Sequence, residues 1–215
     1  KLKQVERLGK GRKAMTRDAA RRALKEKQLD PTKVIPTKSG WWKHVNKKEA
    51  IIRRLIHLMK SNVALACPDS RKCPDYLFRL AELYNALRMN RWKAAMGLHQ
   101  KIYRLKTGGW PAAARRLGKR QKRLFAASRK YLERALEQYV KITNDRRFAG
   151  YVRMDEVIFS VGDIAKTLAE QAGKRGDQKS RKLYQKVMLD QFSRLIRFHP
   201  KSPFIPDALL AKGEY

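Results

Sequence analysis

Acidic residues are scarce in this chain of 215 residues. It carries 19 Asp and Glu against 52 Lys and Arg, which gives a formal net charge of +33 at pH 7. The net charge falls along the chain, from +14 over residues 1–62 and +15 over residues 63–150 to +4 over residues 151–215. The surplus of positive charge lies mainly in the first two ranges. It makes an anionic polymer or an acidic protein surface the expected partner.

Cysteine is scarce too, because only Cys67 and Cys73 are present, with five residues between them. Two ligands cannot complete a tetrahedral zinc site, and no histidine lies at a partner spacing, so we expect no metal and no cofactor. A local disulfide between Cys67 and Cys73 is the favoured interpretation, and it requires an oxidising compartment. Reduced thiols would instead indicate a cytoplasmic location.

Long apolar runs are missing. No stretch approaches the about 20 apolar residues that a helix needs to cross a bilayer, so no transmembrane segment is expected. The first residue is Lys1 rather than Met, from which we expect a processed chain or a fragment. The last residues read as the beginning of a helical hairpin, so we expect further repeats or a partner chain to follow.

Motifs for catalysis are also lacking, and no catalytic residue is predicted. The four histidines are scattered, and Gly9-Lys10-Gly11 is too short for a phosphate-binding loop. Asp155 and Glu156 are best explained as first-turn carboxylates that suit the helix dipole. We therefore predict that the protein is not an enzyme.

Apolar residues recur at helical spacing and no segment has the pattern of a strand, which predicts an all-α fold of about eight helices. Between residues 108 and 111, two glycines and a proline predict a break. The helices expected before residue 151 are 16–28, one that starts at Asn46–Glu49, 74–88 with 92–105 as its partner, and 112–142.

The helix expected to begin at Asn46–Glu49 has a pattern like a capping box, after a loop over residues 33–42. Its apolar side chains predict a wide buried face, made of Ile51, Ile52, Leu55, Ile56, Leu58 and Met59.

A cluster of cations lies near the start of the helix expected over residues 112–142. It consists of Arg115, Arg116, Lys119, Arg120, Lys122 and Arg123. Four of them, at positions 116, 119, 120 and 123, share one face of a helix, where mutual repulsion favours a bound anion. A solvated helix face is the competing interpretation. Phosphates of nucleic acid, of lipid or of a surface polymer would all fit.

Further cations occur upstream, at residues 10–13 and 43–48, next to Trp41 and Trp42. Aromatic rings beside cations suit stacking on bases or sugar rings, although anchoring of a helix junction is the favoured role for these two tryptophans.

The last 65 residues contain the elements of a helical-repeat hairpin. Gly162 is placed to let a second helix pack closely, Phe192 and Leu195 to fill the groove, and Pro200 to end the second helix. The distance from Gly162 to Pro200 exceeds that of a standard repeat of about 34 residues. We assign the excess to a long turn over residues 173–180 with extended helix ends.

Residues 192–215 combine an aromatic, Leu195-Ile196, Pro200, the turn Ser202-Pro203-Phe204 and Pro206-Asp207-Ala208 before Gly213-Glu214. This pattern resembles the tetratricopeptide repeats of bacterial envelope proteins, such as the cell-division coordinator associated with Tol-Pal and the barrel-assembly lipoprotein. Residues 74–84 and 154–159 further resemble multi-repeat envelope proteins of predatory and gliding deltaproteobacteria. The close match covers about 25 residues and the looser one about 140.

The resemblance implies stacked helical hairpins and a periplasmic or envelope-associated scaffold that holds other proteins of a larger complex. We expect a basic segment over residues 1–62, divergent helical repeats over 63–150, and a tetratricopeptide-like hairpin with the start of the next repeat over 151–215. The alternative is a nucleic-acid-binding component of a ribonucleoprotein particle in the cytoplasm, where chains of this charge are common.

Overall fold

The computed structural model describes residues 40–67 and 71–214, with side chains from residue 47 onward. Within these ranges the chain is all-helical and contains no strand. Its α-helices are α4 (Gly40–Ala66), α5 (Cys73–Met96), α6 (His99–Thr107), α7 (Pro111–Asn144), α8 (Met154–Lys174), α9 (Gln178–Phe198) and α10 (Ile205–Gly213). A short 3-10 helix, η1 (Arg146–Phe148), joins α7 to α8. The helix expected over residues 16–28 lies outside the described residues.

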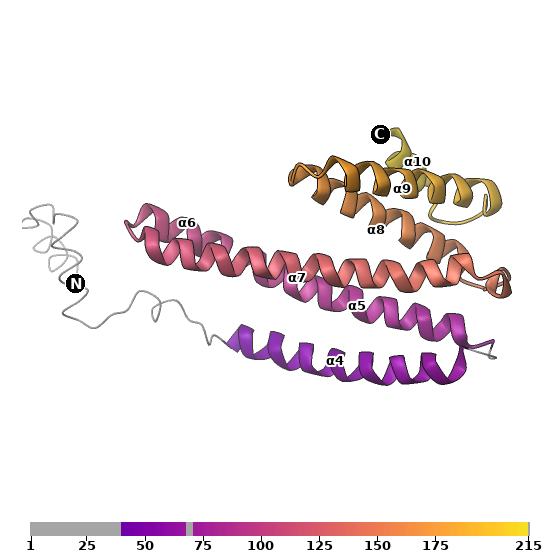
Figure 1. Cartoon of the computed structure of the whole chain (residues 1–215), viewed down its shortest axis with the longest axis horizontal. Coiled ribbons are helices and arrows are strands. Elements are labelled where there is room, and N and C mark those ends of the chain that lie inside the picture. Colours follow the sequence, from indigo (N-terminus) through magenta and orange to yellow (C-terminus); the bar gives the residue numbers. More distant parts are fainter. Residues whose placement is uncertain (1–39, 68–70, 215) are drawn as a thin grey trace, which may run out of the picture.

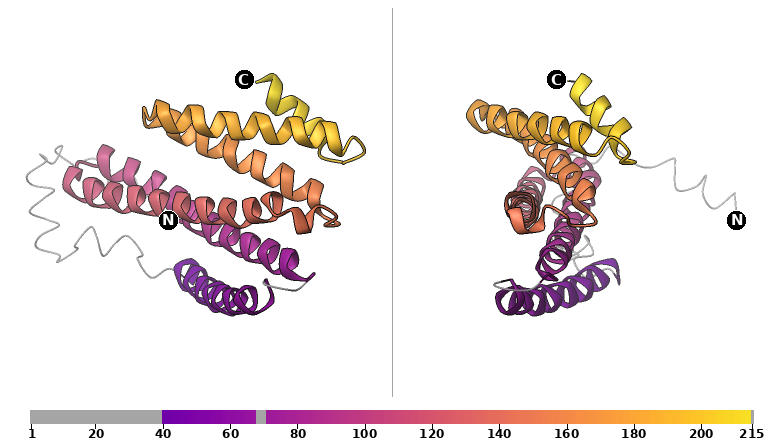
Figure 2. Two further views of the ribbon diagram at one scale, coloured as in Figure 1. Left: turned by 45° about the vertical axis from the view of Figure 1, so that its right-hand side comes forward. Right: turned by 90° about the vertical axis from the view of Figure 1, so that its right-hand side faces the viewer.

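The helices stack in successive layers (Figures 1 and 2). The main packing pairs are α5 with α7 and α8 with α9, each a pair of long neighbouring helices. Further contacts place α4 against α5, α8 against α7, and α10 against α9. One cluster of buried apolar side chains runs through these layers, from Ile52 in α4 to Ala211 in α10. Burial of this shared surface is the main force that holds the layers together.

Aromatic side chains pack together between α8, α9 and the turn that follows α9. The ring of Phe192 is buried and lies 5.8 Å, between centroids, from that of Phe159 in α8. The ring of Phe159 also stacks on Phe204 at 4.8 Å. The hydroxyl of Ser202 donates to Oδ2 of Asp155 at 2.8 Å, so the turn after α9 is bound to the first turn of α8.

The turn between α8 and α9 is shorter than expected. Helix α8 continues to Lys174 and α9 begins at Gln178, so only residues 175–177 connect them, not the whole of 173–180. Gly176 has φ +76, which permits the sharp reversal. The extra length therefore lies in the helices themselves, which contain 21 residues each.

Two expectations for α5 and α6 were wrong. Helix α5 does not end near Arg88 but runs to Met96, because no strong breaker occurs before Gly97. Its main partner is α7 rather than the segment 92–105. The expected break between residues 108 and 111 is present, since α6 ends at Thr107 and α7 begins at Pro111.

Helix α4 also differs from its expected form. It begins at Gly40, so Asn46–Glu49 is not a capping box but part of the helix. Ile52 and Ile56 are buried, whereas Ile51, Leu55 and Leu58 are 58%, 41% and 52% exposed. Among the described residues, α4 lies at the edge of the stack and packs mainly on α5, so these residues cover one of its sides.

A buried carboxylate fixes α4 to the rest of the stack. The side chain of Glu49 accepts hydrogen bonds from Arg53 of its own helix, at 2.7 Å, and from Arg91 of α5. Arg53 also donates to the hydroxyl of Tyr131 in α7 at 2.6 Å. Glu49 therefore links three helices through two guanidinium groups.

Candidate anion-binding arm

Helix α6 and the first half of α7 form a hairpin that projects past the ends of α4, α8 and α9 (Figure 1). We call this hairpin, residues 98–123, the arm. Gly109 at its tip has φ +83, a value that glycine adopts without strain. Pro111 then occupies the first turn of α7, where a missing N–H costs nothing.

The base of the arm has a small core of its own. Ala94, Ala95, Leu98 and Leu124 are buried together, with Ile102 packed against them. The two alanines let α5 and α7 approach closely, and Nε2 of Gln121 donates to the carbonyl oxygen of Ala95 at 3.0 Å. These contacts set the direction of the arm relative to the stacked helices.

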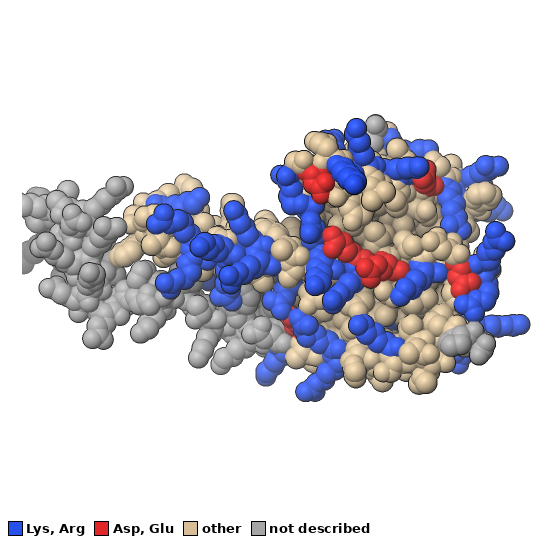
Figure 3. All heavy atoms as spheres, in the orientation of Figure 1, with Lys and Arg blue, Asp and Glu red and all other residues tan. Residues whose placement is uncertain are grey.

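All six cations predicted to bind an anion lie on α7 within this arm, and all are exposed. The cationic stripe of Arg116, Lys119, Arg120 and Arg123 lies on the exposed part of α7, whereas Ala114 and Leu124 of the same helix are buried. Among the described residues, no carboxylate forms an ion pair with positions 115, 116, 119, 122 or 123. Figure 3 shows Lys and Arg gathered on the arm, while most carboxylates in that view lie on the wider part of the molecule.

Helix α6 contributes cations that the sequence-based prediction missed. Arg104 and Lys106 are exposed and Lys101 is half-buried. A signal for them exists in the sequence, because residues 83–132 contain 14 Lys and Arg and no Asp or Glu. Two basic helices, joined by a tight turn, therefore both contribute exposed cations to the arm.

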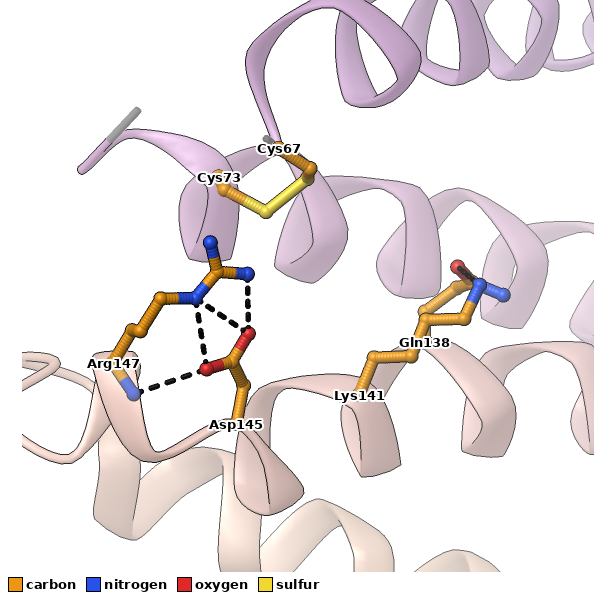
Figure 4. Close-up of a disulfide and its surroundings, with 6 residues drawn as sticks. All are labelled: Cys67, Cys73, Gln138, Lys141, Asp145 and Arg147. Carbon is orange, nitrogen blue, oxygen red and sulfur yellow. Dashed lines mark hydrogen bonds and ion pairs between the residues drawn. A yellow bond between two sulfur atoms is a disulfide. The ribbon is translucent and has the colours of Figure 1, made fainter. Parts of the chain in front are cut away.

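The disulfide lies at the opposite end of α7. Cys67 and Cys73 are bonded, with sulfur atoms 2.03 Å apart, and join the end of α4 to the first residue of α5 (Figure 4). They line an open pocket of about 580 Å³, together with Val63, Leu77, Phe148 and the polar side chains of Lys141, Asn144, Asp145, Arg146 and Arg147. Along α7, Lys141 of the pocket lies 18 residues after Arg123 of the cationic stripe, which is about 27 Å, so the pocket and the stripe are separate sites.

The carboxylate chemistry of the pocket is limited to one side chain. Its one carboxylate, Asp145, accepts hydrogen bonds from the guanidinium and the backbone N–H of Arg147 at 2.7 to 3.1 Å. These hydrogen bonds lower the pKa of Asp145 below its ordinary value of 3.8, so the group is a poor general base.

The remaining predicted site residues are distant from the arm in the chain. Gly162 and Phe192 lie in direct contact, Leu195 is buried beside them in the same cluster, and Pro200 follows the end of α9. Trp41 and Trp42 belong to the first turn of α4, but their side chains lie outside the described part, as do residues 10–13.

The chain matches no protein-family model, no curated protein and no solved structure. Within residues 40–67 and 71–214, no helix is long and apolar enough to span a membrane. The same residues contain no group of three His, Cys, Asp or Glu side chains that could hold a metal ion.

Proposed function

We propose that this chain is a non-enzymatic helical-repeat scaffold whose arm docks on an anionic polymer. The observation that carries the proposal is the arm itself, a projecting hairpin with many exposed cations in a 50-residue stretch, 83–132, that has no carboxylate. Cations held on a rigid helix attract a polyanion without first having to be ordered. Mutual repulsion between them is relieved when phosphates bind.

The scaffold part of the proposal rests on the stacked helices. Helices α5 and α7, α8 and α9, and then α10 follow one another as pairs with a shared core, the arrangement by which helical-repeat proteins build extended surfaces. The contact between Gly162 and Phe192, and the bond from Ser202 to Asp155, support a tetratricopeptide-type hairpin. Other proteins of a larger assembly would bind along this stack.

A periplasmic or envelope location is part of the same proposal. The disulfide between Cys67 and Cys73 supports it, since such bonds persist in oxidising compartments. Mass spectrometry of the native protein after alkylation tests this location. Bonded sulfurs are expected, whereas two alkylated thiols would argue for the cytoplasm.

The docking test compares two variants with equal loss of charge. In the arm variant, all six predicted cations become Gln. In the control, Gln replaces six exposed cations around the α8–α9 turn, namely Lys174, Arg175, Lys179, Arg181, Lys182 and Lys186. Affinity for single-stranded RNA and for vesicles of anionic phospholipid is measured at several salt concentrations.

The arm variant should bind at least one of these probes much more weakly than the control does. Its slope of log affinity against log salt should be shallower by about 0.7 for each phosphate that the variant no longer neutralises, the value for single strands. Equal weakening in the arm variant and the control would show that only the overall charge matters. That result would overturn the docking role of the arm.

A nucleic-acid-binding role in a ribonucleoprotein particle is the second candidate. It is favoured by Tyr103, which is 64% exposed on α6 between Lys101 and Arg104. An exposed ring among cations suits stacking on an unpaired base, which is worth about 1–3 kcal/mol per base. Tyr103→Ala should then weaken RNA binding and leave vesicle binding unchanged. Equal effects on both probes would argue against this candidate.

A further inference from the structure

Helix α4 carries an apolar stripe on its uncovered side. Ile51, Leu55, Leu58 and Leu65 are 58%, 41%, 52% and 83% exposed. Their positions, together with Asn62, are separated by four, three, four and three residues, which places all five along one line of the helix. Large apolar side chains gathered in this way on a surface mark an interaction site.

The spacing is that of a coiled-coil seam. Alternating steps of three and four residues keep a seam facing a second helix. The polar member, Asn62, occupies a seam position at which a single Asn fixes the register of a pair at some cost in stability. The inner side of α4 is already used, because Ile52 and Ile56 belong to the shared core and Met59 and Val63 pack against it.

The charges along the stripe indicate the chemistry of its partner. Lys47 and Arg54 lie seven residues apart along its outer edge, and Lys48 lies at its N-terminal end; all three are exposed. The only carboxylate of α4 is Glu49, which is buried and bonded to Arg53 and Arg91. Within the described residues, therefore, no negative charge on α4 balances this edge.

We propose that the stripe of α4 binds an amphipathic helix of another protein that has Leu or Ile on one face and carboxylates beside that face. Apolar side chains would fill the seam, and the carboxylates would pair with Lys47 and Arg54. A second copy of this chain is a poorer fit, because it would bring the same cations to the interface. The inference is independent of whether the arm binds a polyanion.

The probe for the test is a peptide of about three heptads, with Leu at the seam positions and Glu at the flanking positions of each. A second peptide has Lys in place of Glu, and a third keeps Glu but has Gln in place of Leu. Binding is measured by fluorescence anisotropy to the full chain with the six arm cations changed to Gln. Attraction of the acidic peptides to the arm is thereby reduced, and what remains is the same for the two peptides that contain Glu.

The Leu/Glu peptide should bind at least about tenfold more tightly than either of the others, a difference of about 1.4 kcal/mol. Leu58→Glu with Leu65→Glu should abolish this preference. The matched control is Leu183→Glu with Leu210→Glu, since these leucines are also well exposed, and it should leave binding unchanged. Lys47→Glu with Arg54→Glu should reverse the preference in favour of the Lys peptide.

A gain of affinity provides a check that does not depend on damaging the helix. Asn62→Leu should tighten binding of the Leu/Glu peptide, because an apolar side chain replaces a polar one in the seam. Unchanged or weaker binding would contradict the proposed orientation of the peptide.

Coverage of the stripe by another part of this chain, or by a second copy, can be detected in the purified protein. Leu58→Cys should react with a thiol-alkylating reagent as fast as Leu183→Cys does. Slow alkylation at every protein concentration would show that another part of the same chain covers the stripe. Protection that appears only at high concentration would indicate a second copy. Either result, or equal binding of all three peptides, would overturn the proposal.

Discussion

Gly162 of α8 lies so close to the ring of Phe192 in α9 that no side chain fits between them. A Cβ added to Gly162 would be 2.7 Å from Cδ1 of Phe192 and closer still to Cε1. Since Phe192 is 1% exposed and packed on all sides, its ring has no room to move away.

Gly162→Ala should therefore destabilise the protein by about 1–3 kcal/mol, the usual cost of overpacking, despite the better helix propensity of Ala. Urea denaturation followed by circular dichroism measures this cost. Phe192→Leu introduced with Gly162→Ala should recover part of the loss, because the smaller side chain makes room. A larger residue at 162 should cost more than any single Lys substitution.

Gly118 provides the opposite case in the same type of helix. A Cβ added there would meet no atom within 4 Å. Gly118→Ala should stabilise α7 by about 0.5–1 kcal/mol, because Ala loses less backbone entropy on folding. Hydrogen exchange of amides near residue 118 measures the local effect. Loss of stability in both glycine variants would contradict the assignment of Gly162 as a packing position.

Removal of the carboxylate of Glu49 should loosen α4. Glu49→Gln leaves Arg91 without its counter-charge at a site where the Glu49 side chain is 8% and that of Arg91 31% exposed. We expect a loss of about 1–3 kcal/mol in the free energy of unfolding. The control is Glu133→Gln, which removes a more accessible pair with Arg129 at 3.4 Å, with side chains 36% and 37% exposed, and should change little. Equal losses would show that Glu49 has no special role.

Asp177 should make the stability of α9 depend on pH. Its side chain caps α9, and its hydrogen bonds with Ser180 lower its pKa below the ordinary value of 3.8. Because the pKa of Asp177 is lower in the folded than in the unfolded protein, its stabilising effect is complete above the pKa of the unfolded state. The effect is lost as the pH falls through the pKa of the folded state. The difference in Tm between the protein and its Asp177→Asn variant should thus shrink between about pH 5 and pH 2. A difference in Tm that does not change with pH would argue against the Asp177 carboxylate as the source of the pH dependence.

The disulfide should stabilise the junction of α4 and α5. It closes a short loop, with a sequence separation of 6, for which the entropic estimate is roughly 2 kcal/mol. Cys67→Ser with Cys73→Ser should lower stability by about this amount, as should reductant added to the unmodified protein. Reductant should have no effect on the double variant. If it lowers the stability of that variant too, the reductant acts elsewhere.

Sequence patterns predicted best those features of the fold that depend on residues close together in the chain. The glycines and proline at 108–111 end one helix and start the next through their own backbone preferences, and α6 and α7 meet there. Likewise the spacing of Arg116, Lys119, Arg120 and Arg123 determines that they share a face once a helix forms. Such features need no knowledge of the rest of the fold.

The wrong expectations for α4 involve distant parts of the chain. The pattern at Asn46–Glu49 looks like a cap, but Glu49 is held by Arg91, which is 42 residues away. Ile51, Leu55 and Leu58 have the composition of a buried face, yet burial depends on how many neighbours α4 has. No pattern within α4 itself contains that information.

Helix α7 continues without interruption from the arm into the stack, where it packs on α5 and α8. Gly118 lies within the arm, and beyond it α7 contains no proline or glycine, the usual causes of a kink. The α7 side of the arm therefore enters the stack without a break, whereas the α6 side is separated from α5 by Gly97 and Leu98. If the arm binds a polyanion as proposed, a force on that ligand would be transmitted along α7 to α8, which packs against it.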